Sequence, residues 1–254
     1  MSLIDELVAS ARKRAEALPP REHLPEWAAR PRPSRPSFRE ALRGKAHLDV
    51  IAEFKRASPS LGAIAERGLE DQVRRYAQAG AAAISVLTEP SRFKGSLSDL
   101  ERTVASVEVP VLMKDFVVHP AQIREAAFLG ASAVLLIVRC LSREQLSELA
   151  QAADELGLTP LVECHHAREL ERALEIEDAV IGVNNRDLDT LAIDTSLSPR
   201  ALADVPRERV VVAESGYEHA EDVAELRGVA DAVLVGSALM KLGDPTQRIQ
   251  EIRG

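Results

Sequence analysis

Eight short apolar runs, spread evenly between residues 50 and 235, constrain the fold of this chain more than any other feature. Their first residues lie about 26 residues apart on average, which leaves room for one strand, one helix and two short loops. The runs are Val50–Phe54, Ala83–Leu87, Val111–Lys114, Ala133–Val138, Thr159–Glu163, Val180–Asn184, Val210–Ala213 and Ala232–Val235. We therefore predict eight consecutive strand–helix units.

The stretches between these runs carry helix signals, and the way the strands must be covered decides the architecture. Ser142 is placed to begin a helix that closes at Gly157, and Pro120 suits a first helical turn. Continuous apolar strands have to be covered on both faces, and eight such units achieve this by closing into a barrel. We predict an α/β fold, a (β/α)8 TIM barrel with an N-terminal helical extension.

A doubly wound open sheet is the alternative architecture. Such a sheet that binds a dinucleotide carries G-x-G-x-x-G after its first strand, whereas this chain reads Lys55-Arg-Ala-Ser-Pro-Ser there. The dinucleotide fingerprint is missing from that turn, and we expect no cofactor.

The first 48 residues lack the alternating strand and helix patterns of the rest of the chain. Residues 3–18 form an amphipathic pattern that begins at a capping box of Ser2 and Asp5. Six of the 14 prolines lie from Pro19 to Pro36, which indicates an extended connector, and Ser37 is placed to cap a short helix through Arg43. We expect residues 1–48 to be an extension and connector over the bottom or one edge of the mouth of a barrel at 49–254, in one structural domain.

Composition excludes several classes of protein. With 46% hydrophobic and 28% charged residues the chain can bury a large core, and its longest apolar runs fall far short of the ~20 residues that cross a bilayer. The net charge of −8 argues against a nucleic-acid partner. Two cysteines, Cys140 and Cys164, are too few for a disulfide framework, and we expect buried free thiols. We expect a cytoplasmic protein with no membrane partner.

Chemistry in this fold lies at the C-terminal ends of the strands. The residues found there are Glu53, Lys55, Lys114, Phe116, Glu163, Asn184, Arg186, Glu214, Ser215, Gly216, Gly236 and Ser237. Any one charge taken alone is typical of a solvated rim. Five charges of mixed sign together end otherwise apolar strands, where burial without partners is costly. The lysines are candidates for general acids or carboxylate anchors, and the glutamates for a base or for partners that orient a lysine.

Glycines after the last two strands favour an anion site. Gly216, and Gly236 with Ser237 at the start of a short helix, match the recurrent phosphate site of barrels, where backbone N–H groups face the anion. The alternative is that these glycines serve only tight turns. His165 and His166 are adjacent and cannot share one helix face as metal ligands, so we expect no metal.

With these strand ends in view, the sequence closely resembles the indole-3-glycerol phosphate synthase family of tryptophan biosynthesis. The resemblance rests on seven ordered motifs, which are highly specific as a set. They are Ile51–Ser60, Leu87–Ser96, Pro110–Phe116, Leu161–His165, Ile181–Arg186, Ala213–Gly216 and Val235–Ser237. One departure is Ala121, where the family often has an aromatic residue after the proline.

The resemblance implies a phosphorylated small-molecule substrate, 1-(2-carboxyphenylamino)-1-deoxyribulose 5-phosphate, which is cyclised with loss of CO2 and water. By motif, Lys114 would be the general acid of ring closure, and Glu163 a base or a stabiliser of the developing cationic ring system. Lys55 would pair with the substrate carboxylate and is a candidate acid for dehydration, and the division of steps between the two lysines stays open.

Further roles follow from the same motifs. Glu53, Asn184 and Glu214 would orient these groups and the substrate hydroxyls. Residues expected to bind the substrate are Ser58, Gly216, Gly236 and Ser237 at the phosphate, Phe116 and Pro59 at the anthranilate ring, and also Arg186, Ser215 and Leu234. We expect a monomer, with a weak dimer as the alternative. The competing functions are an aldose–ketose isomerase on a related phosphate-binding barrel, and a barrel that binds a phosphorylated ligand without catalysis.

Overall fold

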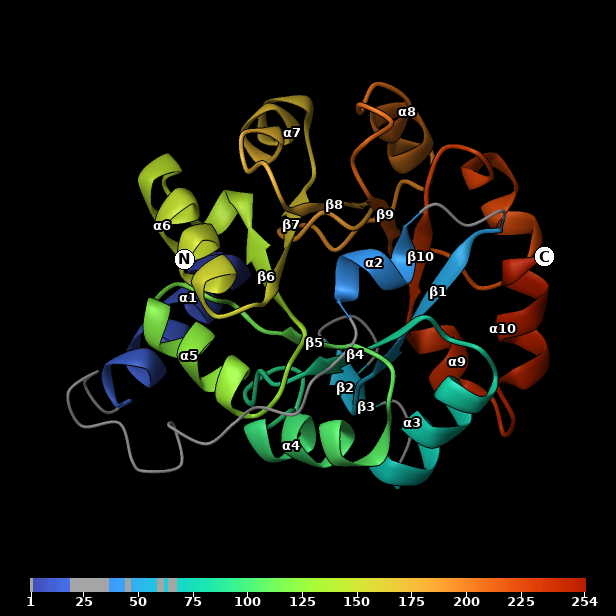
Figure 1. Cartoon of the computed structure of the whole chain (residues 1–254), viewed down its shortest axis with the longest axis horizontal. Helices are drawn as coiled ribbons and strands as arrows, with labels where there is room; N and C mark the ends of the chain where they lie inside the picture. The colour runs from blue at the N-terminus through green and yellow to red at the C-terminus, as the bar shows by residue number, and fades with distance from the viewer. Residues whose placement is uncertain (1, 19–36, 44–46, 59–61, 64–67) are drawn as a thin grey trace.

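The computed structural model describes residues 2–18, 37–43, 47–58, 62–63 and 68–254, and its centre is a closed barrel of parallel strands (Figure 1). Within the described residues each barrel strand pairs with the next along the chain, and β10 pairs with β1. The barrel strands are β1 (Asp49–Phe54), β4 (Ala83–Leu87), β5 (Val111–Lys114), β6 (Ala133–Ile137), β7 (Thr159–Cys164), β8 (Val180–Asn184), β9 (Val211–Glu214) and β10 (Ala232–Val235). The predicted (β/α)8 barrel is confirmed.

Helices cover the outside of the barrel. They are α3 (Leu69–Gln78), α4 (Leu97–Ser106), α5 (Pro120–Phe128), α6 (Arg143–Glu155), α7 (Ala167–Leu174), α8 (Leu197–Ala203), α9 (Ser237–Lys241) and α10 (Thr246–Arg253). Ser142 caps α6 with a full capping box, and Pro120 occupies the first turn of α5, as the sequence predicts. None of the described helices is long and apolar enough to cross a membrane.

Three connections differ from the predicted strand–helix pattern. The segment between β9 and β10 forms a 3₁₀ helix, η4 (Glu221–Leu226), in place of an α-helix. The loop after β1 contains a small antiparallel hairpin of β2 (Ala57–Ser58) and β3 (Gly62–Ala63). This hairpin was not predicted, because none of the apolar runs covers it. A short 3₁₀ helix, η3 (Val138–Cys140), follows β6, so that strand ends one residue earlier than predicted.

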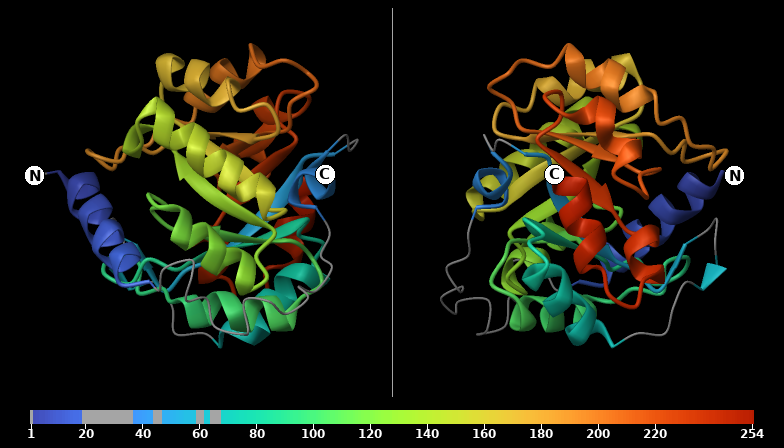
Figure 2. Two further views of the ribbon diagram at one scale, coloured as in Figure 1. Left: turned by 60° about the vertical axis from the view of Figure 1, so that its left-hand side comes forward. Right: turned by 90° about the vertical axis from the view of Figure 1, so that its right-hand side faces the viewer.

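The helices that precede the barrel lie on opposite sides of it (Figure 2). Helix α1 (Leu3–Glu16) begins at the predicted capping box of Ser2 and Asp5 and lies at the mouth, where Leu3, Ile4 and Leu7 line a cavity. Helix α2 (Phe38–Leu42) lies at the bottom, because Arg39 donates a hydrogen bond to the backbone of Asp178, which precedes β8.

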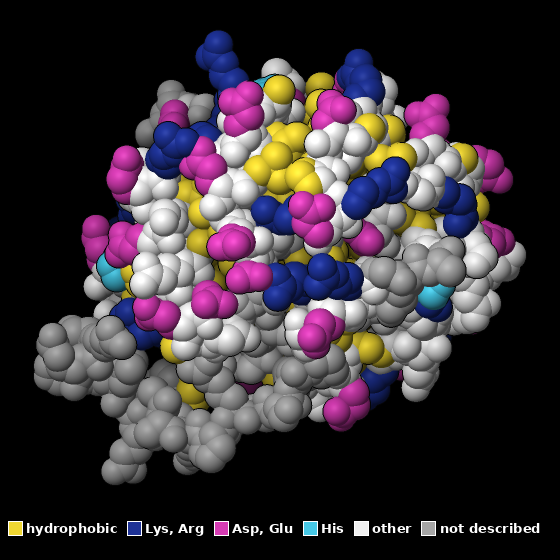
Figure 3. Space-filling model, turned by 45° about the horizontal axis from the view of Figure 1, so that its top comes forward, with side chains coloured by type: hydrophobic (Ala, Val, Ile, Leu, Met, Phe, Trp, Pro, Cys, Tyr) yellow, Lys and Arg dark blue, Asp and Glu magenta, His cyan; other side chains and the backbone are white. Residues whose placement is uncertain are grey.

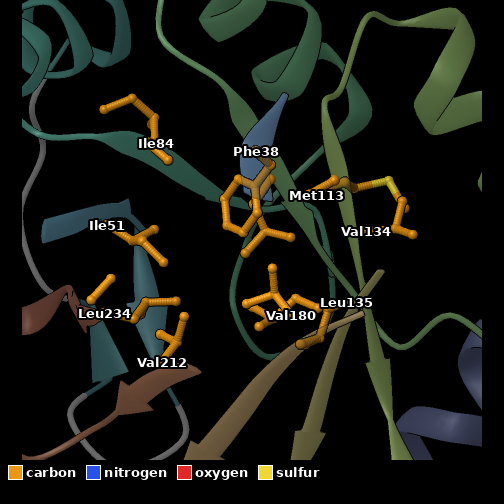
Figure 4. Packing of buried hydrophobic residues seen from close by; sticks show 14 of the residues in the cluster. Phe38, Ile51, Ile84, Met113, Val134, Leu135, Val180, Val212 and Leu234 are labelled. Carbon is orange, nitrogen blue, oxygen red and sulfur yellow. The ribbon is translucent and has the colours of Figure 1, made fainter. Parts of the chain in front are cut away.

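The floor of the barrel is closed by an aromatic side chain from α2. Phe38 is fully buried and belongs to the same hydrophobic core as the strands. Figure 4 shows it pointing into the packed region that Met113 and Val180 also enter. Chemistry is thereby confined to the opposite end of the barrel, where the strand ends remain open.

A buried carboxylate fastens α1 to the mouth. Arg14 donates two parallel hydrogen bonds to Asp115, at 3.0 and 2.7 Å, and only 2% of the Asp115 side chain is exposed. Thr88 Oγ1 and the Phe116 N–H donate to the same carboxylate at 2.8 and 2.7 Å. Such a bidentate pair is geometrically specific as well as strong. An exposed pair between Arg92 and Glu6 is a second link from α1 to the barrel.

The two cysteines are free. Cys164 is buried, as predicted, and its Sγ lies 3.3 Å from the carbonyl oxygen of Gly182. Cys140 is only half-buried, so the expectation of two buried thiols is wrong for it: it belongs to η3, a turn after the strand and not the strand itself. Burial raises the pKa of the Cys140 thiol to about 12, so it stays protonated at neutral pH.

We predict that Arg14→Ala destabilises the fold much more than Arg92→Ala. Removing Arg14 leaves a buried carboxylate without its cation, and the free energy of unfolding should fall by about 2 kcal/mol. Arg92 is the matched control, because its pair with Glu6 is half exposed and should be worth less than about 0.5 kcal/mol. Urea unfolding of both variants measures the difference, and equal losses would contradict the assigned role of the Arg14–Asp115 pair.

Candidate active site

A cavity of about 360 Å³ opens at the C-terminal ends of the barrel strands. Among the predicted site residues, those that line it are Glu53, Lys55, Ser58, Lys114, Phe116, Glu163, Asn184, Arg186, Ser215, Gly216, Leu234, Gly236 and Ser237. Pro59 lies outside the described residues. Glu214 is fully buried and does not line the cavity, so it lies behind the residues that do. The predicted set is therefore brought to one place, with one carboxylate recessed.

The ammonium of Lys114 is the centre of this site. Its Nζ lies 2.6 Å from Glu214 Oε2, 3.7 Å from Glu53 Oε2 and 3.9 Å from Glu163 Oε2. Glu53 also binds the second lysine, because Lys55 Nζ lies 2.7 Å from its Oε1. All five side chains are at most 15% exposed. Two ammonium groups and three carboxylates thus share a nearly dry space.

Strand alternation explains why these side chains meet. Residues two apart on a strand point to the same face, so Glu53 and Lys55 both face the inside of the barrel. Glu163 and Glu214 come from β7 and β9, and Lys114 ends β5, which lies opposite β9 and two strands from β7. A long lysine side chain can span the barrel interior, which the shorter glutamates line from other strands.

Burial and sharing of one cation set the protonation of the cluster. Removal from water and repulsion by Glu163 outweigh the attraction of Lys114 and raise the pKa of Glu214 to about 7. Burial opposes the charge on Lys114, but the three surrounding carboxylates raise its pKa above the ordinary lysine value. Burial likewise disfavours ionised Glu53, yet Lys55 and Lys114 lower its pKa. At neutral pH Lys114 is therefore charged and placed to donate a proton or bind an anion.

The glycines after β9 and β10 are required by close contacts. Ser215 and Gly216 both have positive φ, 67° and 92°, and a Cβ on Gly216 would lie 2.6 Å from Thr195 Cγ2. A Cβ on Gly236 would lie 2.9 Å from Lys55 Nζ and would also collide with Glu53. Gly236 therefore brings bare backbone next to the charged cluster, which a tight turn alone would not demand.

Asn184 ends β8 and Arg186 follows it, and both residues are tied to the backbone around them. Asn184 Oδ1 accepts a hydrogen bond from the Arg186 N–H at 3.0 Å, and Arg186 Nη1 donates to the carbonyl oxygen of Leu191 at 3.1 Å. His165 Nε2 lies 2.7 Å from the carbonyl oxygen of Arg186 and is buried. His165 thus belongs to the packing of this loop, whereas His166 is exposed. The part of the chain that is described holds no group of three residues placed for a metal.

The apolar wall of the cavity includes residues that sequence reasoning missed. Phe93 lies in the loop after β4, and Leu3, Ile4 and Leu7 come from α1. The loop is ordered by Glu89, which is fully buried and accepts the backbone N–H groups of residues 91, 92 and 93. The resemblance included the motif Leu87–Ser96, but no residue of this loop was predicted to line the site. The apolar face of α1 predicted that the helix packs against the protein, but not which part it contacts.

Comparison with known proteins points to one family. The family model described as indole-3-glycerol phosphate synthase matches residues 4–252. The chain is 51% identical over 218 residues to the indole-3-glycerol phosphate synthase of Deinococcus radiodurans, covering 82% of this chain and 80% of that protein. It is 45% identical over 249 residues to the one from Leifsonia xyli subsp. xyli, covering 96% and 94%.

Solved structures of low sequence identity share the fold. A thiamine phosphate pyrophosphorylase from Pyrococcus furiosus superposes with a TM-score of 0.61 at 16% identity, covering 85% of this chain and 96% of that one. A structure titled native KDPGal superposes with a TM-score of 0.58 at 18% identity, covering 82% and 94%. At such identity the likeness supports the barrel architecture alone.

We predict that Glu214→Gln gains thermal stability relative to wild type as the pH rises from about 5 to 8. Between the ordinary pKa of 4.5 and the raised value of about 7, the folded state holds a proton on Glu214 that the unfolded state lacks. The free energy of unfolding contributed by this group therefore falls as the pH rises through that window. Glutamine does not titrate, so the variant escapes this loss. Thermal melts of both proteins across the range measure it, and a difference in Tm that does not change with pH would contradict the raised pKa.

Proposed function

The chain belongs to the indole-3-glycerol phosphate synthase family, and on that basis we propose how its residues divide the reaction. The activity is that of a carbon–carbon lyase in tryptophan biosynthesis. It closes the ring of 1-(2-carboxyphenylamino)-1-deoxyribulose 5-phosphate with loss of CO2 and water, which gives indole-3-glycerol phosphate.

Lys114 is the general acid of ring closure in this proposal. The ring carbon that bears the carboxylate attacks the ketone carbon of the sugar chain, and the ketone oxygen then needs a proton. The observation that carries the assignment is that Lys114 Nζ lies at the cavity within 4 Å of Glu53, Glu163 and Glu214. These carboxylates keep it charged before substrate arrives, and they can stabilise it again after it receives a proton back.

Glu163 and Lys55 act in the two steps that follow, the loss of CO2 and the loss of water. The closed ring carries positive charge until CO2 leaves with its bonding electrons left on the ring, and Glu163 is the carboxylate placed to stabilise that charge and to accept a proton. Lys55 anchors the substrate carboxylate and is the candidate acid for the departing hydroxyl. Its ion pair with Glu53 at 2.7 Å holds it at the same cavity. Asn184, Glu53 and the recessed Glu214 orient these groups.

The remaining cavity residues divide into a phosphate end and a ring end. Ser58, Ser215, Gly216, Gly236 and Ser237 would hold the phosphate, since backbone N–H groups after β9 and β10 can approach it where glycine leaves room. Arg186 would add a cation at the same mouth. Phe116 and Leu234 would face the anthranilate ring, together with Pro59.

Family membership supports this activity over the isomerase considered from the sequence. An aldose–ketose isomerase on a related barrel would use a cysteine or aspartate acid–base pair at the strand ends. The cysteine of β7 is Cys164, and its Sγ lies against the carbonyl oxygen of Gly182 and does not line the cavity. Burial also raises the pKa of this thiol, which keeps it from acting as a base.

We propose further that the protein works in the cytoplasm as a monomer, with a weak dimer as the alternative, and with no nucleic-acid or membrane partner. The net charge is −8, and acidic and basic side chains are interspersed over the face in Figure 3. In this proposal residues 1–48 and the barrel at 49–254 form one structural domain. Light scattering tests the oligomeric part, and a mass near 27.6 kDa supports a monomer whereas a doubled mass rejects it.

We predict that Lys114→Ala and Glu163→Gln lose most of kcat, whereas Ser237→Ala chiefly raises KM. The first two remove groups that act in the transition state, and the last removes a contact that holds the phosphate before and during reaction alike. The measurement is indole fluorescence after the deoxyribulose phosphate substrate is added to each purified variant. Equal activity in all three would reject the division of roles.

A further inference from the structure

Gly182 is a residue of the barrel interior to which no role has been given. It lies on β8, level with Glu163 on β7 and two residues before Asn184, which is level with Glu214 on β9. Because residues in register on neighbouring parallel strands face the same way, Gly182 faces the inside of the barrel between these two carboxylates. A side chain at this position would stand in the charged cluster.

The space above Gly182 is occupied by the side chain of Glu214. A Cβ on Gly182 would lie 2.5 Å from Glu214 Oε1 and 3.2 Å from Leu161 Cδ1. The first distance is shorter than van der Waals contact allows, so the carboxylate would have to move. The glycine is not needed for its backbone, because its φ lies outside the left-handed region and β8 is a regular strand here. What the position requires is the absence of a side chain.

The carboxylate above Gly182 has little freedom elsewhere. Glu214 is fully buried, and its Oε2 is bound to Lys114 Nζ at 2.6 Å. Its Oε1 has no hydrogen-bond partner among the described residues. Oε1 can lie over the strand because Gly182 leaves room for it there.

We propose that Gly182 is a positioning residue, which acts through Glu214 to hold the Lys114 ammonium where it meets the substrate. The bare strand lets the Glu214 carboxylate lie across β8, so that it reaches Lys114 from beside Glu163. The same device recurs at Gly236, where a Cβ would collide with Glu53 and Lys55. Glycines on the inner face thus provide the space in which the charged cluster is packed.

The inference rests on the proposed role of Glu214 and Lys114. It predicts that Gly182→Ala lowers kcat by about 10- to 100-fold while KM changes less than about threefold, because the catalytic group is displaced and the phosphate end is untouched. It also predicts that the basic limb of the kcat/KM profile moves to lower pH. Lys114 loses part of its closest counter-charge in the variant, so its pKa falls.

The experiment is a double-mutant cycle of Gly182→Ala and Glu214→Asp. Aspartate is one methylene shorter and does not reach over residue 182, so the added methyl group should cost little further activity in that background. The matched control is Gly243→Ala, at an exposed position where a Cβ meets nothing within 4 Å, and it should keep wild-type kcat. Circular dichroism and thermal melts establish that each variant folds.

Each outcome decides the inference. A large loss from Gly182→Ala in the wild-type background and a small one beside Glu214→Asp supports it, and so does a Gly182→Ala variant that folds only when Glu214→Asp is also present. The inference is overturned by additive losses or by a wild-type kcat and pH profile in Gly182→Ala. It is also overturned if Gly182→Ala fails to fold both alone and together with Glu214→Asp. If Glu214→Asp keeps wild-type kcat, the role of Glu214 itself is wrong. If Glu214→Asp is slow and Gly182→Ala is not, only the inference about Gly182 is wrong.

Discussion

The sharing of one ammonium by three carboxylates is the interaction on which the rest of the site depends. Lys114 is surrounded by Glu53, Glu163 and Glu214, and Lys55 offsets part of the charge of Glu53. With all groups ionised, the cluster would hold one more negative than positive charge in a nearly dry space. The rise in the pKa of Glu214 toward neutrality relieves that excess, while the raised pKa of Lys114 keeps this lysine a cation. In the proposed reaction the substrate brings both a carboxylate and a phosphate, and the glycines after β9 and β10 would hold the phosphate.

Chain from the N-terminal extension helps to keep the cluster dry at both ends of the barrel. Phe38 of α2 fills the floor, and the apolar face of α1 lies along the wall of the mouth. The clamp that holds α1 is built into the strand end that carries Lys114, because Asp115 follows Lys114 directly and binds Arg14. Stability of the mouth and placement of Lys114 therefore depend on neighbouring residues of one short segment.

Much of this architecture could be predicted from the sequence, because its signals are local. Apolar runs, the capping box at Ser2, the helix start at Ser142, and Pro120 act within a few residues of where they stand, and each lies where expected. Strand ends with charged residues identified the members of the cluster for the same reason. The recess of Glu214 could not be predicted, since it depends on the missing side chain of Gly182 on the neighbouring strand. The position of α1 at the mouth depends on the ion pair between Arg14 and Asp115, which is 101 residues away in the sequence. The 3₁₀ helix between β9 and β10 and the half-buried Cys140 are likewise products of packing, which periodicity does not reveal.

The central claim is that the carboxylates around Lys114 hold it in the charged form in the free enzyme. Titration of the lysine side chains by NMR, through the carbon bonded to each Nζ, tests it most directly. The chain has six lysines, so the Lys114 signal can be assigned by its absence from Lys114→Gln. The account predicts that Lys114 titrates above the ordinary lysine value of 10.5, and that its midpoint falls when Glu214 is replaced by glutamine. A midpoint below 10.5 in the wild-type protein, or one that Glu214→Gln leaves unchanged, would contradict it.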